Sequence, residues 1–131
     1  MSDCQFCRIV QKQEPALVVF ENSKYLAFLD KYPQAPGQLQ LIPKVHYRWV
    51  YEIPEMGDFF LTAQKIIRAI IPVLRADHVT LMALGHQVPH AHLWIVPQYQ
   101  KEIGVVERRG EATRDRDQEI RVIFKNSHLE C

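Results

Sequence analysis

The chain has 131 residues, which is enough for one domain with one hydrophobic core. Its net charge of +1 gives no electrostatic reason to expect nucleic acid or a membrane surface as a partner. There is no apolar run long enough to cross a bilayer and no recognisable secretory signal, so we expect a cytoplasmic protein.

The first part of the chain predicts a short helical turn followed by three strands. Asn22 and Ser23 separate two apolar runs, LVVFE and KYLAFLD, and this arrangement predicts a hairpin. The later segment QLQLI alternates polar and apolar residues, which is typical of a half-buried strand. The expected ranges are a helical turn over 7–11 and strands over 17–21, 24–30 and 38–42.

The second part predicts one long helix and two further strands. The helix begins near Pro54 and runs to about Leu74, because apolar residues recur there at helical spacing and form one buried stripe. Strands are expected over 78–84 and 88–96, joined by a turn that contains Gly85. Residues 107–119 are rich in charge and predict a surface loop, while 118–125 fit either a short amphipathic helix or an edge strand.

Three polar or aromatic side chains share one face of the last of these strands, within the segment GHQVPHAHLWIVP. Side chains alternate along a strand, so His90, His92 and Trp94 are expected on the same side. A neutral imidazole serves as a nucleophile, a proton carrier or a metal ligand near neutral pH. The alternative is that both histidines are hydrogen-bonded interior residues without a chemical role.

Two cysteines near the start are spaced as Cys4-x-x-Cys7, so that both thiols can approach one ion from a single turn. If His46 and His90 join them, the four residues form a closed tetrahedral Cys2His2 shell, which is the pattern of a structural zinc site. The spacing also allows two reduced thiols beside two unrelated histidines. A redox-active pair is a third interpretation, but the chain lacks the βαβ context of a thioredoxin-like motif.

Three separated motifs resemble the histidine-triad (HIT) superfamily, in its zinc-containing form. They are CQFCRIV, FLDKYPQAPGQLQLIPKVHY and GHQVPHAHLWIVP, and their order and spacing follow the family over about residues 4–98. The resemblance implies a single α+β domain over 1–131, with a five-stranded antiparallel sheet, one long helix and a short C-terminal element. Residues 99–131 would be a family-variable extension. It also implies a homodimer.

The same resemblance implies a role for individual residues. His92 matches the nucleophile that attacks the α-phosphate of a nucleotide and forms a nucleotidyl-histidine intermediate. Asp30 matches the acidic residue that accepts hydrogen bonds from the ribose hydroxyls. The base is expected on Phe6, Ile9 and Phe28, the phosphates on Gly85, His86 and Gln87, and a structural zinc ion on Cys4, Cys7, His46 and His90.

The third histidine of the triad is Trp94 in this chain (HxHxW), and indole offers an N–H donor but exchanges no proton near neutral pH. The loop between Val79 and Gly85 also lacks the asparagine that the family usually places near the phosphates. The tryptophan favours phosphorolysis or nucleotidyl transfer slightly over hydrolysis, whereas the missing asparagine indicates a different substrate or weak activity. The expected substrate is a purine nucleotide, such as a dinucleoside polyphosphate or a nucleoside phosphoramidate. The alternative is a weakly active or inactive nucleotide-binding adaptor stabilised by zinc.

Overall fold

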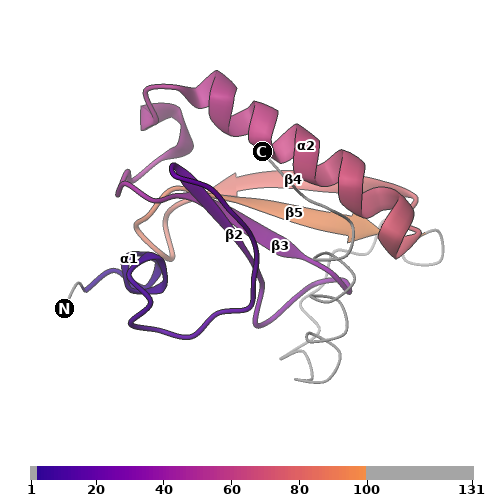
Figure 1. The fold of residues 1–131 in the computed structure, drawn as a ribbon, viewed down its shortest axis with the longest axis horizontal. Helices are drawn as coiled ribbons and strands as arrows, with labels where there is room; N and C mark the ends of the chain where they lie inside the picture. The colour runs from indigo at the N-terminus through magenta and orange to yellow at the C-terminus, as the bar shows by residue number, and fades with distance from the viewer. Residues whose placement is uncertain (1–2, 100–131) are drawn as a thin grey trace.

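The computed structural model describes residues 3–99, and the two C-terminal elements expected within 107–125 lie outside that range. Five strands form one antiparallel sheet in the order β1-β2-β3-β5-β4, as the resemblance implied. Figure 1 shows the long helix α2 lying along one face of this sheet and the short helix α1 on the opposite side. The elements are α1 (Gln5–Val10), β1 (Val18–Glu21), β2 (Tyr25–Leu29), β3 (Leu39–Pro43), a 3-10 turn η1 (Val50–Glu52), α2 (Met56–Leu74), β4 (His78–Leu84) and β5 (His92–Gln98).

The hairpin of β1 and β2 is confirmed, and the side chain of Asn22 closes its turn. Asn22 Oδ1 accepts hydrogen bonds from the backbone N–H groups of Lys24 and Tyr25, at 2.9 and 2.7 Å. An Asx turn of this kind replaces backbone partners and explains why asparagine suits the position.

The main core lies between α2 and the facing side of the sheet. The predicted stripe of α2 is buried there, with Phe59, Ile66 and Ile70 fully excluded from solvent. Leu93 and Ile95 of β5 point into the same core, together with alternate residues of β2 and β3. Burial of these apolar side chains is the principal force that holds α2 on the sheet.

A smaller apolar cluster lies on the other face of the sheet, where α1 packs. It contains Phe6 and Ile9 from α1 and Leu26, Phe28 and Ile42 from the strands. Because both faces are covered, all five residues of β3 are buried. The expectation of a half-buried strand is therefore wrong.

The last strand also begins later than predicted. β5 starts at His92, and His90 lies in the turn that joins it to β4. The two histidines are nevertheless both buried, with exposed fractions of 0 and 4 %. Among residues 3–99, no helix has the length and apolar character needed to cross a membrane.

Candidate active site and metal centre

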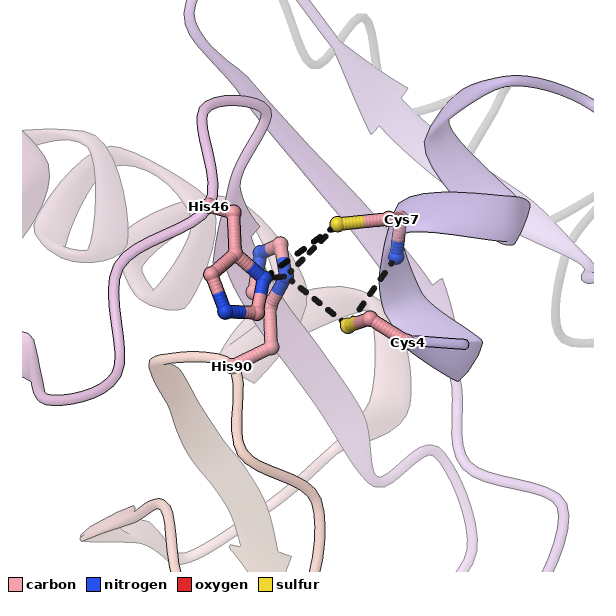
Figure 2. A group of neighbouring side chains, drawn as sticks. All are labelled: Cys4, Cys7, His46 and His90. Atoms are coloured by element: carbon pink, nitrogen blue, oxygen red, sulfur yellow. Dashed lines mark hydrogen bonds between the residues drawn. The ribbon is translucent and has the colours of Figure 1, made fainter. Parts of the chain in front are cut away.

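Four side chains from three separate segments converge at one end of the sheet. Cys4 and Cys7 belong to the N-terminal turn of α1, His46 follows β3, and His90 precedes β5. Figure 2 shows the two thiols facing the two imidazoles, with all four groups directed at one point. Their candidate ligand atoms all lie within 4.8 Å of one another. The structure thus brings together all four residues of the predicted metal site.

The distances between these atoms match those expected around one tetrahedral ion. Cys4 Sγ lies 3.4 Å from Nδ1 of His90, and Cys7 Sγ lies 3.3 Å from Nδ1 of His46 and 3.5 Å from Nδ1 of His90. The two Nδ1 atoms are 3.2 Å apart. Zinc bonds of about 2.3 Å to sulfur and about 2.0 Å to nitrogen give edges of about 3.5 Å for S···N and about 3.3 Å for N···N. The residues therefore fit a divalent ion of that size.

The backbone fixes the tautomer of His90. Its Nε2 lies 2.8 Å from the carbonyl oxygen of Pro43, and since a carbonyl only accepts, Nε2 carries the proton and donates. The unprotonated Nδ1 then faces the two thiols. Burial lowers the pKa of His90 to about 4, so the ring is neutral near pH 7. A neutral imidazole with its second nitrogen held by an acceptor is the arrangement expected of a metal ligand.

His92 has the opposite tautomer. Its Nδ1 lies 2.8 Å from the carbonyl oxygen of His90 and must donate to it, which leaves a lone pair on Nε2. Burial lowers the pKa of His92, against the opposing effects of that hydrogen bond and of the negative charge of Asp30. The ring is thus kept in the neutral form, in which Nε2 can act as a nucleophile or as a base.

The three residues expected to line the base site belong to one apolar cluster, and one of them contacts His92. Phe6 contacts the His92 ring edge to face, with ring centroids 5.1 Å apart, and contacts Phe28 in the same way at 5.4 Å. Ile9 belongs to the same apolar cluster. The structure therefore places Phe6, Ile9 and Phe28 together, with Phe6 against the imidazole of His92.

Asp30 is buried beyond the end of β2 and is held by three hydrogen bonds. Its Oδ1 accepts from the backbone N–H of Tyr32 at 2.9 Å, and its Oδ2 accepts from Nε2 of Gln38 and Gln40 at 2.9 and 3.1 Å. The sequence reasoning did not identify Gln38 and Gln40 as site residues. The signal available was their alternation in QLQLI, which predicts that both side chains point to the same side of the chain, Gln40 within β3 and Gln38 just before it.

The predicted phosphate-binding residues lie in the turn between β4 and β5. His86 and Gln87 are exposed, and the positive form of His86 would lower the pKa of His92, so the two rings are close enough to interact electrostatically. Gly85 is buried against the main chain of Arg48 and the ring of Trp49, where an added Cβ would lie 2.7 and 2.8 Å from their atoms. Gly85 thus has a packing role that the sequence did not reveal.

Trp94 stands on β5 two residues after His92, on the same face of the sheet. It pairs with Gln40 of β3 on one side and Met82 of β4 on the other. Its indole Nε1 is buried and has no hydrogen-bond partner within residues 3–99.

Comparison with known proteins agrees with this architecture. The HIT domain model matches residues 11–101. An uncharacterised HIT-like protein of Saccharolobus solfataricus is 34% identical over 106 residues, which cover 76% of each chain. An adenosine 5′-monophosphoramidase of Saccharomyces cerevisiae is 28% identical over 108 residues, covering 79% of this chain and 67% of the yeast protein.

Among solved structures, a zinc-bound histidine triad family protein from Mycobacterium smegmatis resembles this chain. The two superpose with a TM-score of 0.80 and 27% sequence identity, over 95% of this chain and 92% of the mycobacterial one.

Proposed function

Because the chain belongs to the HIT domain family, we propose that it cleaves or transfers a nucleotidyl group through a covalent intermediate on His92. The observation that carries the proposal is the hydrogen bond from Nδ1 of His92 to the carbonyl of His90. That bond fixes the ring and leaves Nε2 unprotonated, while burial keeps the ring neutral. These are the two conditions for a histidine nucleophile.

In the proposed first step, the lone pair of His92 Nε2 attacks the α-phosphorus and forms an N–P bond. The bond from phosphorus to the leaving group breaks, and the leaving group departs with its electron pair. The carbonyl of His90 stabilises the positive ring that results, because the Nδ1 proton stays on the imidazole. His86, Gln87 and the backbone of the turn are proposed to bind the phosphate oxygens.

In the second step, an acceptor oxygen attacks the phosphorus, the N–P bond breaks and its electron pair returns to Nε2. Any proton that the acceptor carries passes to solvent, and His92 returns to its neutral form with the proton on Nδ1. Trp94 cannot take part in this proton transfer. We therefore favour an acceptor that arrives partly ionised, such as inorganic phosphate, over water. A purine nucleotide suits the apolar rings of Phe6 and Phe28, and the yeast relative acts on an AMP-linked substrate by its name.

We propose that the metal is zinc and that its role is structural. Two thiols and two imidazoles are the soft donor set that zinc prefers, and four protein ligands leave no position for a substrate. Bound zinc would tie α1 to the turn before β5, and so would hold Phe6 against His92. Cys4 and Cys7 would have to stay reduced to bind the ion, so we also propose a reducing compartment such as the cytoplasm.

We also propose a homodimer. β4 is one of the two edge strands of the described sheet, and its residues Leu81 and Met82 are 44 and 37 % exposed. An edge strand with exposed apolar side chains is a surface that a second copy could cover.

The alternative function is a nucleotide-binding adaptor without turnover. The observation in its favour is Trp94, which replaces the last proton-transferring group of the triad on the same face as His92. This reading keeps the zinc ion and the base site but predicts no covalent intermediate.

Rapid quench with α-³²P-labelled diadenosine polyphosphate and adenosine phosphoramidate separates the two functions. We expect an acid-labile ³²P-protein adduct in the wild type, and nucleoside diphosphate as the product when inorganic phosphate is added. AMP alone, with or without phosphate, would indicate hydrolysis. Binding without an adduct or product from either substrate would reject the proposed enzyme in favour of the adaptor.

A further inference from the structure

Two aromatic side chains form an exposed platform where the chain enters η1. The rings of Trp49 and Tyr51 lie nearly parallel, with an interplanar angle of 10° and centroids 6.2 Å apart. Tyr51 is 73 % exposed, although aromatic side chains in proteins usually bury most of their area. A stacked pair that leaves one ring in water offers a surface on which another planar group can stack.

The backbone beneath the two rings is held by its own hydrogen bonds and by the core. The N–H of Trp49 donates to Oε1 of Glu52 at 2.9 Å, and the N–H of Glu52 donates to the carbonyl oxygen of Trp49 at the same distance. Val50 and Ile53 are buried in the main core and anchor the chain on either side of Tyr51. A ligand that stacks on this platform therefore has little backbone to order.

The platform lies next to the turn that is proposed to bind the phosphates. An added Cβ on Gly85 would lie 2.8 Å from Cε3 of Trp49, so this glycine and the indole pack directly against one another. The other end of the turn reaches the proposed base site, because Val88 packs on the apolar cluster of Phe6 and Phe28. Figure 1 shows the turn before β5 between α1 and the segment that carries η1. One turn thus connects two aromatic surfaces.

Arg48 adds a positive charge to the platform. Its side chain is exposed, and its guanidinium lies over the indole of Trp49, with Cζ 5.0 Å from the ring centroid. A guanidinium can donate to phosphate oxygens while it stays stacked on an aromatic ring. A base on the rings with phosphates beside Arg48 uses both features, whereas an uncharged apolar ligand would use the rings alone.

Two aromatic surfaces joined by a phosphate-binding turn favour a ligand with a base at each end. A mononucleotide fills the site at Phe6 and has no second planar group for Tyr51. A dinucleoside polyphosphate carries its second base beyond the bond that His92 is proposed to cleave, on the nucleotide that departs. The platform is placed where that second base would lie if the phosphate chain follows the turn from Val88 to Gly85.

We propose that Trp49 and Tyr51 bind the second base of a dinucleoside polyphosphate, and that Arg48 binds the phosphates that lead to it. This assignment rests on the proposed nucleotide site, and it selects one substrate class among those that the site admits. It makes Tyr51 a specificity residue for the leaving nucleotide.

Calorimetric titration with two ligands that cannot be cleaved tests the assignment by binding alone. They are diadenosine tetraphosphate and adenosine 5′-tetraphosphate, each with methylene groups in place of the bridging oxygens between phosphates. The second ligand has the same phosphate chain and carries no less negative charge, so tighter binding of the first comes from its second base. In the wild type we expect the diadenosine ligand to bind about tenfold more tightly.

Tyr51→Ala should reduce this ratio to the statistical factor that two equivalent ends provide, because the exposed ring is lost. Tyr51→Phe is the matched control, since it keeps the ring and removes only the hydroxyl, and it should keep the wild-type ratio. Both variants should fold, because the side chain is largely in solvent. Arg48→Met should weaken the binding of both ligands, since both carry the phosphates.

A wild-type ratio that persists in Tyr51→Ala would overturn the assignment, and so would a wild-type protein that prefers the diadenosine ligand by no more than the statistical factor. Unchanged affinities in Arg48→Met would overturn the role of Arg48. Failure of both ligands to bind would overturn the platform together with the proposed function. A preference that Tyr51→Ala removes, in a protein that forms no adduct on His92, would reject the proposed turnover and leave the second base site standing.

Discussion

His90 and His92 lie two residues apart and are equally hidden from solvent, yet they offer opposite ring nitrogens. His90 donates from Nε2 to the carbonyl of Pro43 and presents Nδ1 to the thiols. His92 donates from Nδ1 to the carbonyl of His90, which leaves the lone pair on Nε2, and its ring packs against Phe6 of α1. In both cases a main-chain acceptor decides which nitrogen is left for chemistry, and therefore whether the ring suits a metal or a phosphorus atom.

The polar groups around the two rings differ in whether the described residues supply all of their partners. The metal centre takes all four donors from this chain, and their spacing already fits one ion. The face around His92 instead contains polar atoms that the described residues do not satisfy, on Gln40 and Trp94. The first region offers four side chains that could hold one ion, and the second has unsatisfied polar atoms on the same face as His92.

The largest expected effect is the loss of turnover in His92→Ala. Removal of the nucleophile should lower kcat by at least about 10³-fold. The metal content and the fold should persist, because His92 contributes no ligand atom to the cluster. Steady-state kinetics and elemental analysis measure the two effects. His78→Ala is the control, since His78 is half exposed and pairs with Asp77. Turnover that survives in pure His92→Ala would contradict the assignment.

The next effect is on stability, at the metal centre. Cys7→Ser should reduce the metal content from one zinc ion per chain to near zero and lower Tm by about 10 °C, because metal binding is coupled to folding. Chelation of the wild type should reproduce the shift, and the variant should no longer respond to chelator. Differential scanning calorimetry with and without chelator measures both. An equal response in the two proteins would show that the cluster holds no stabilising ion.

A smaller effect is expected from the turn that joins β4 to the two histidines. Gly85→Ala should lower the free energy of unfolding by about 1–3 kcal/mol, because the new Cβ would meet Arg48 and Trp49 at 2.7 and 2.8 Å. Gly57→Ala is the matched control in α2, where nothing lies within 4 Å of the added carbon. Urea unfolding compares the two. Equal stability of both variants would mean that the turn adjusts freely.

Much of the fold and the membership of the site could be predicted from the sequence. The period of the apolar residues in α2 and the Asn22 turn are local signals, and both elements form where they were expected. The four candidate ligands were identified from spacing and family motifs, and the structure assembles them. These features depend on side-chain type and chain order, which a sequence states directly.

The rest depends on partners that have no sequence signature. The tautomers of His90 and His92 are set by the backbone carbonyls of Pro43 and His90. Because nearly every residue carries such a carbonyl, the sequence does not show which one each ring will meet. The network of Gln38 and Gln40 on Asp30 forms because β3 is covered on both faces, whereas alternation in QLQLI predicted one exposed side.

The central claim is that two neighbouring histidines are held in opposite tautomers for different tasks. Long-range ¹H–¹⁵N correlation spectra of protein labelled with ¹⁵N-histidine test it directly, with cadmium-113 substituted for zinc. We expect the proton on Nδ1 in His92 and on Nε2 in His90, with a cadmium coupling to Nδ1 of His90 and none to His92; comparison with His92→Ala assigns the signals. A proton on Nε2 of His92, or a cadmium coupling to that ring, would contradict the account.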